Sequence, residues 1–187
     1  TPLREKNIES LSRIQRLNLE LQGLDKENTR IQDEIENIKK TIKTLDDDIS
    51  REKGIIIDAN SNEKRLKEEK NELIEIDSKY YDTEKQSDND LNTSKDKLQS
   101  EIEKVKELIN SQKNQEAISA IDNCKLLIEA YAGSYSKNEN IKKESVKRNE
   151  RIKVIDTEIE SWKNLLLNSE KMVSQLTERR SKLNDQL

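Results

Sequence analysis

The fold is decided by residues 21–73, which read LQGLDKENTRIQDEIENIKKTIKTLDDDISREKGIIIDANSNEKRLKEEKNEL. Apolar residues recur there at alternating spacings of three and four, so they fill the a and d positions of a heptad repeat. With Leu21 as an a position, the polar occupants of this repeat are Asn28, Glu52, Glu63 and Lys70. A repeat kept over so many heptads holds one apolar stripe, here called the seam, on one side of a helix. It predicts a partner helix and a left-handed supercoil.

The composition favours a coiled coil over a compact core. Of the 187 residues, 30% are hydrophobic and 40% are charged, and the chain has no Phe and one Trp. Such a balance fits either disorder or a long helix that buries one narrow stripe, and the heptad repeat selects the helix. Glycine is rare and the one proline is Pro2, so little interrupts a helix. We therefore predict an all-α fold of long coiled-coil helices with breaks, either an extended rod or an antiparallel helical hairpin.

The strength of the seam divides the chain into segments. A long heptad-repeat helix is expected over 1–81, followed by a polar break at 82–97, which reads DTEKQSDNDLNTSKDK. Its Asp, Asn, Ser and Thr side chains compete for backbone hydrogen bonds and favour turns. Helical segments are expected over 98–131, with a weak point near 110–116. They restart the stripe in another frame, at Leu98, Ile102, Val105 and Ile109.

A second break is expected at 132–140, where Gly133 would end a helix, and a last heptad-repeat helix at 141–187. The spacing from Leu21 to Ile152 is 131 residues, which is not a multiple of seven, so one uninterrupted supercoil cannot hold both seams. The interruptions are expected to absorb this phase change. They are also expected to act as joints, with 82–97 the most pronounced and the fastest to exchange its amide hydrogens.

Four features of the seam and its flanks invite a functional interpretation. Asn28, at an a position, either sets register or is a tolerated solvated residue. Trp162, at a d position, is either a large packing residue or a partner-specific anchor. Cys124 lies at helical spacing from Ile118, Ile121 and Ile128, which predicts a packed thiol. The acidic run Asp46–Asp48 is typical of a solvated helix face rather than of a metal site.

The charges limit the choice of partner. The 35 basic and 39 acidic residues are interleaved, unlike the one-sided basic face of a nucleic-acid-binding protein, so DNA is expected to be contacted only indirectly. The g positions are mostly acidic, as at Glu20, Glu27 and Glu34. Antiparallel self-pairing along the seam would set acid against acid, and parallel self-pairing would attract at Glu34–Lys39 and Asp48–Lys53 but repel at Glu20–Asp25. The pattern leans toward a different helix as the partner.

The sequence carries no sign of an enzyme. It has no His, no glycine-rich phosphate loop, no CxxC pair and no nucleophile beside a base, so no catalytic, cofactor-binding or metal-binding residue is assigned and no cofactor is expected. No apolar run is long enough to span a membrane, and the sequence shows no signal-peptide pattern. These features predict no membrane partner and a cytoplasmic location. The chain opens Thr1–Pro2 without a methionine, which predicts that it is a piece of a longer protein.

Residues 155–183, IDTEIESWKNLLLNSEKMVSQLTERRSKL, resemble the coiled-coil arm of bacterial structural maintenance of chromosomes (SMC) proteins. The features shared are a Trp within a Glu- and Lys-rich heptad run and an Arg pair after it. The N-terminal segment RIQRLNLELQGL is compatible with the part of such an arm that follows the hinge. The motifs that define the family, namely the P-loop, the signature motif, the acidic ATPase motif and the glycine-rich hinge, are absent from this sequence.

The resemblance implies a role in an ATP-driven machine for chromosome condensation and segregation. This segment would be the structural lever between hinge and head, paired with a helix of the same or a sister arm in a dimeric parent protein. The alternative is a scaffold or tethering coiled coil without a motor. A P-loop and a hinge in the flanking sequence would separate the two.

Overall fold

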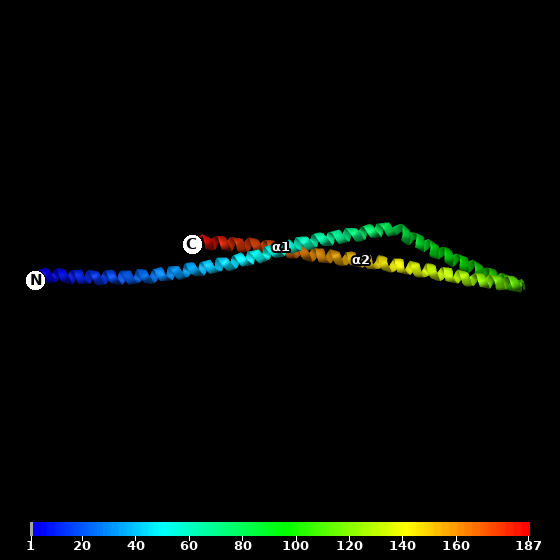
Figure 1. The fold of residues 1–187 in the computed structure, drawn as a ribbon, viewed down its shortest axis with the longest axis horizontal. Coiled ribbons are helices and arrows are strands. Elements are labelled where there is room, and N and C mark those ends of the chain that lie inside the picture. The colour runs from blue at the N-terminus through cyan, green and yellow to red at the C-terminus, as the bar shows by residue number, and fades with distance from the viewer. Residues whose placement is uncertain (1) are drawn as a thin grey trace. The chain divides into compact units, whose positions relative to one another are not determined.

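The computed structural model describes residues 2–187, so the first residue of the helix expected over 1–81 lies outside the described residues. Two helices make up the fold: α1 spans Pro2–Asn110 and α2 spans Asn114–Asn184, which are 109 and 71 residues long (Figure 1). Residues 2–187 contain no strand. The prediction of an all-α fold of long helices is therefore confirmed.

The turn between α1 and α2 consists of residues 111–113 and is closed by backbone hydrogen bonds. Gln112 donates its N–H to the Ile109 carbonyl at 3.0 Å, and Lys113 donates to the Leu108 carbonyl at 2.9 Å. Gln112 has a φ of 56°, in the left-handed region. This combination is a Schellman motif, which ends a helix by satisfying its last carbonyl groups. The chain thus leaves the helix inside the weak point expected at 110–116.

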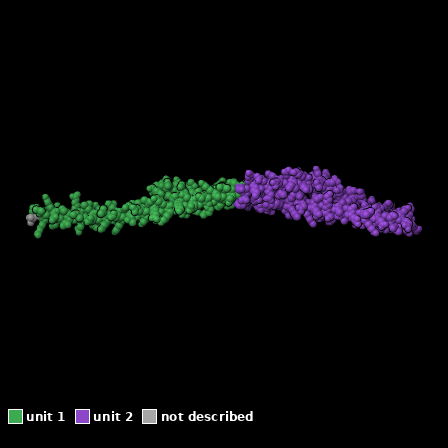
Figure 2. Space-filling view, in the orientation of Figure 1, with its two compact units in different colours: residues 1–60, 164–187 green, residues 61–163 purple. Residues whose placement is uncertain are grey.

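The chain divides into two units, one of Thr1–Asn60 with Asn164–Leu187 and the other of Ser61–Lys163, coloured green and purple in Figure 2. In the second unit, α1 and α2 lie side by side in opposite directions. Lys70 contacts Asp156, Asp77 contacts Arg148, and Ser94 contacts Ser134. Because the α2 partner moves back along the chain as α1 advances, this unit is an antiparallel hairpin. Of the two predicted arrangements, the structure shows the hairpin.

The core of the second unit is a row of side chains between the two helices. Leu66 and Ile155 are fully buried and Ile159 is 8% exposed, and Leu73 and Trp162 pack against them. Each such side chain contributes roughly 1.5–3 kcal/mol when it leaves water. Near the turn, the buried residues are the small Ala117 and Ala120, at 4% exposed each.

The first unit pairs the middle of α1 with the end of α2. Leu45, Ile49 and Ala59 are buried on α1, and Ser169 is buried on α2. Arg180 on α2 binds Asp46 on α1, with its Nε 2.5 Å from the carboxylate. Residues 2–34 of α1 are exposed throughout, and the first seam residues to lose exposure are Ile35 and Ile38.

The helices do not stop at the two polar segments where the sequence predicts breaks. α1 is continuous through 82–97, and α2 is continuous through 132–140. In the first segment, polar side chains on the seam find polar partners on α2, so they do not need the backbone. Gly133 has no positive φ and no side chain within 4 Å of where its Cβ would stand, so it is an exposed helical residue and not a helix end.

The expectation that the heptad frame changes at the breaks within the helices is also wrong. From residue 84 to 108, the seam of α1 keeps the frame of Leu21, and its buried or half-buried members are Glu84, Ser87, Leu91, Ser94, Leu98, Glu101, Val105 and Leu108. Two members of the expected second stripe, Ile102 and Ile109, are 42% and 53% exposed instead. The frames of α1 and α2 differ because the turn separates two antiparallel helices, each of which keeps its own repeat.

Candidate functional site

The most unusual part of the hairpin is a polar section of the seam in the second unit. Asn138 on α2 is 2% exposed, and its side-chain amide donates to Ser87 Oγ at 3.3 Å and to Asp88 Oδ1 at 2.7 Å. Ser87 is 3% exposed. An asparagine buried in a coiled-coil seam fixes register, because any other alignment would leave its amide without a partner. We call the group formed by Ser87, Asp88, Ser94, Ser134, Asn138 and Lys142 the polar section.

Further contacts complete the polar section. Lys142 Nζ lies 3.1 Å from Asp88 Oδ1, and the hydroxyl groups of Ser94 and Ser134 are 3.2 Å apart. The hydrogen bond from Asn138, followed by that from Lys142, lowers the pKa of the Asp88 carboxyl below its ordinary value. Within residues 2–187, every buried side-chain nitrogen and oxygen has a hydrogen-bond partner. The section is therefore polar yet fully satisfied, which avoids the cost of burying unpaired groups.

Beside the polar section, α1 is bent in its green part, where it curves out from α2 and then returns toward it (Figure 1). Arg148 donates to Asp77 at 2.6 Å, and its guanidinium carbon lies 5.5 Å from the centre of the Tyr80 ring. A hollow of about 460 Å³ lies there, lined by Leu73, Ile76, Tyr80, Asn140, Ile141, Glu144 and Arg148. Tyr80 occupies a d position but is 49% exposed, and its ring lies against the Arg148 guanidinium.

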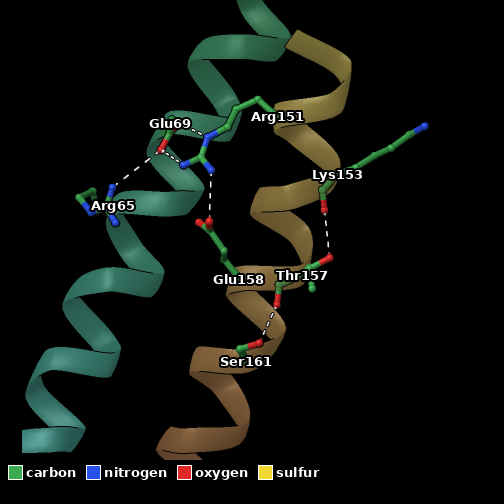
Figure 3. A network of polar contacts seen from close by, with 7 residues as sticks. All are labelled: Arg65, Glu69, Arg151, Lys153, Thr157, Glu158 and Ser161. Carbon is green, nitrogen blue, oxygen red and sulfur yellow. Dashed lines mark hydrogen bonds and ion pairs between the residues drawn. The ribbon is translucent and has the colours of Figure 1, made fainter. Parts of the chain in front are cut away.

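On the other side of this hollow, an ion-pair network centred on Arg151 joins the helices (Figure 3). Arg151 donates from Nε and from one terminal nitrogen to the two oxygens of Glu69, at 2.7 and 3.0 Å, and from the other to Glu158 at 3.2 Å. Arg65 lies 3.8 Å from the same Glu69 carboxylate. The hydrogen bond from Arg151 lowers the pKa of Glu69, and that bond raises the pKa of Arg151. A bidentate pair of this kind adds geometric specificity to the register.

A second candidate is the seam of residues 2–34 in the first unit, which we call the free stripe. Its apolar a and d residues are 44–83% exposed, and they are Leu3, Ile14, Leu17, Leu21, Leu24 and Ile31. They stand in the same frame as Leu45 and Ile49, which α2 covers. A row of exposed large apolar residues marks a surface for another helix.

The residues singled out by sequence lie as follows. Trp162 is half-buried against the core of the second unit, so it is a packing residue there. Asn28 lies exposed on the free stripe. Asp46 and Asp48 pair with Arg180 and Arg51.

Cys124 is half-buried and free, but its surroundings differ from those expected. The residues that share its buried stripe are Ala117, Ala120 and Leu127. The three isoleucines predicted to pack with it, Ile118, Ile121 and Ile128, are 54%, 43% and 52% exposed. The heptad frame of α2 runs through Ala117 and Cys124, and the isoleucines lie just outside it.

The sequence does not predict the polar section, because Ser87 and Ser94 fall within the break expected at 82–97. A signal was present: Ser87, Leu91, Ser94 and Leu98 continue the a and d positions counted from Leu21. Small polar residues in frame are compatible with a continuous seam when the partner helix offers matching groups. The partner could not be aligned before the turn was known.

Comparisons with known proteins return nothing: no protein-family model, no curated protein and no solved structure matches the chain significantly. Within residues 2–187, no helix is long and apolar enough to cross a membrane. The same residues bring together no group of three or more His, Cys, Asp or Glu side chains suited to a metal ion.

Proposed function

We propose that this chain is a structural coiled-coil hairpin that sets the distance and direction between parts of a larger assembly, without a catalytic step of its own. The observation that carries the proposal is the antiparallel pairing in the second unit, where buried polar and ionic contacts hold one register. The Arg151–Glu69 pair and the Asn138 contacts serve alignment, since each links α1 to α2. A fixed register is what a spacer or lever needs, because slippage would change its length.

One specific form of this function is an arm of an SMC-type chromosome-segregation ATPase. It is supported by the resemblance of residues 155–183 and by the long, charged, antiparallel helices. In that form the parent protein is a dimer in the cytoplasm, DNA is contacted only indirectly, and nucleotide is bound by another part of the polypeptide. The polar section would then be a joint at which the arm bends.

The second form is a scaffold or tether without a motor, and the turn favours it. The arms of SMC proteins lead to a hinge, whereas residues 111–113 join α1 and α2 directly. A closed tip gives a helical hairpin that a larger protein can carry as a module. The antiparallel pairing then separates two binding partners rather than a hinge and a head.

ATP photoaffinity labelling of the native protein separates these two forms. An antibody against residues 2–187 would isolate the full polypeptide from its source, and a photoreactive ATP analogue would be added with and without excess ATP. Specific labelling of the polypeptide that carries this hairpin supports the SMC-type arm. Its absence, in a preparation where a known ATPase is labelled as control, supports the scaffold.

The structural function itself is tested in the same native protein. A three-residue insertion is made in α1 beside Glu69 and another in α2 beside Arg151. Together they should take the seam residues out of their heptad frame and abolish function. Insertion of a full heptad in each helix, at matched positions, keeps the seam in frame and should be tolerated far better. Equal loss from both insertions would contradict a role that depends on the pairing register.

A further inference from the structure

The free stripe has a charge pattern that differs from that of the whole seam. Its g positions are Lys6, Arg13, Glu20, Glu27 and Glu34, so the sign changes from positive to negative along the helix. The acidic g positions that disfavour self-pairing of the whole seam extend beyond residue 34, but the seam is exposed only up to that residue and loses exposure from Ile35 onward. Only residues 2–34 remain open, within the part of the chain that the structure describes. The question of self-pairing therefore has to be decided on these residues alone.

We propose that residues 2–34 form an antiparallel coiled coil with the same residues of a second copy of the chain. In an antiparallel pair, each g position faces a g position of the partner helix. One register sets Lys6 against Glu34 and Arg13 against Glu27 of the other copy. By two-fold symmetry each contact occurs twice, which gives four attractive pairs. The one repulsive contact is that of Glu20 with Glu20 of the other copy, at the two-fold axis.

The same register sorts the seam residues into matching layers. Leu17 packs on Leu21 of the other copy, and Ile14 packs on Leu24. Asn28 then faces Ser10, so two polar a and d residues share a layer instead of lying against leucine. The remaining polar seam residue, Asn7, faces Ile31. A register shifted by one heptad would set Asn7 against Leu24, Ser10 against Leu21 and Asn28 against Leu3, so it buries three polar residues against apolar ones instead of one. This gives Asn28 the register-setting role that its position allows.

A parallel pair is disfavoured by the same charges. In register, each g position would face the e position five residues later on the partner. Arg13 would face Asn18 and Lys6 would face Leu11, while Glu20 would face Asp25. Within residues 2–34 no attractive pair forms and one repulsive pair does, and the one attractive contact is that of Glu34 with Lys39, beyond the stripe. Arg30 already contacts Glu27 at 2.6 Å and Glu34 at 3.9 Å within its own helix, but these exposed contacts leave both carboxylates open to a second cation.

The proposal does not depend on the proposed function, and the oligomeric state of the 187-residue chain tests it. Sedimentation equilibrium should show a reversible dimer. Lys6→Glu with Arg13→Glu makes every g position of the stripe acidic and should weaken the dimer about a hundredfold, because four attractive pairs become repulsive. Glu27→Lys with Glu34→Lys should weaken it similarly. Mixing the two variants should restore pairing as a heterodimer, since their g positions are again complementary.

A matched control reverses two cations outside the stripe, Lys153→Glu with Lys171→Glu, both exposed on α2. Lys153 points away from α1 in Figure 3. This control should leave the dimer unchanged. Glu20→Gln removes the repulsive contact at the two-fold axis and should tighten the dimer about twofold. In the register shifted by one heptad, Glu20 faces Arg13 and the same change would loosen it.

Cross-linking tests the direction of pairing. In a Cys124→Ser background, a chain with Asn7→Cys should form a disulfide with a chain carrying Ile31→Cys, because the two positions share a layer. In a parallel pair they lie about 36 Å apart along the helix. A chain that stays monomeric at all concentrations overturns the proposal and assigns the stripe to a helix of different sequence. A dimer whose affinity is unchanged by the double substitution Lys6→Glu with Arg13→Glu overturns it as well, and so does a dimer that cross-links in the parallel direction.

Discussion

Two parts of the same hairpin, the apolar core around Leu66 and the polar section around Asn138, hold α1 and α2 together by different means. Leu66 and Ile155 are both 0% exposed and contribute through burial, which is strong and has no directional preference. Asn138 is almost as deeply buried, but it contributes through hydrogen bonds that require particular partners. The comparison teaches that the apolar part supplies most of the stability, whereas the polar part selects the alignment.

The largest effect should come from the apolar core. Leu66→Ala removes a fully buried side chain from the cluster with Ile155 and Ile159, so the free energy of unfolding should fall by about 2–5 kcal/mol. Urea unfolding followed by circular dichroism measures the change. The matched control is Leu167→Ala, at a residue that is 65% exposed, which should change stability by less than about 0.5 kcal/mol. Equal effects of the two changes would mean that the core is elsewhere.

A smaller effect is expected in the polar section. Asn138→Ala removes the donor to Ser87 and Asp88 and should cost about 1–3 kcal/mol in the same measurement. Replacing both sides of the contact, as Asn138→Leu with Ser87→Ala, should recover most of that loss, because no buried polar group is left unpaired. If the double variant also pairs α1 and α2 in more than one register, as shown by disulfide cross-linking between cysteines placed along the two helices, the asparagine is kept for register. A double variant less stable than Asn138→Ala would contradict this account.

The polar section should also respond to acid. The pKa of Asp88 is lowered in the folded chain, so the folded state binds this proton more weakly than the unfolded state does. Its contribution is therefore complete above the unfolded pKa, near 4, and is lost as the pH falls through the lower folded value. The free energy of unfolding should decline between roughly pH 5 and pH 3. Asp88→Asn should flatten this part of the profile, and so should Asn138→Ala, which removes the main cause of the shift.

The smallest effect should come from the solvent face of the segment predicted as a break. Gly133→Ala should raise the free energy of unfolding by about 0.5–1 kcal/mol, because alanine favours helix and no atom lies near its Cβ position. Thermal unfolding measures it, with Gly54→Ala as the matched change in the first unit. A loss of stability at Gly133 alone would show that 132–140 needs glycine and restore the prediction of a helix end there.

Much of the fold follows from the sequence because a heptad repeat is a local pattern. The a and d positions from Leu21 to Leu73 predict a long helix with one buried face, and the low content of glycine and proline lets it continue. Ser87 and Ser94 were misjudged because their suitability for the seam depends on Ser134 and Asn138, which lie 40 to 51 residues away. The expected joint at 82–97 stays a prediction, since a continuous helix can still open more easily where its seam is polar.

The sequence by itself determined that this chain is helical, that its helices pair through a narrow seam, and that Trp162 stands on that seam, because these properties depend on periodicity alone. The tertiary structure decided where the chain reverses, since Gln112 enters the left-handed region without the glycine that usually marks such a turn. The reversal brings Arg151 to Glu69 and Asn138 to Ser87, and it leaves residues 2–34 uncovered. Which residues are buried and which remain free is a property of the pairing register, and that register exists only once the two helices meet.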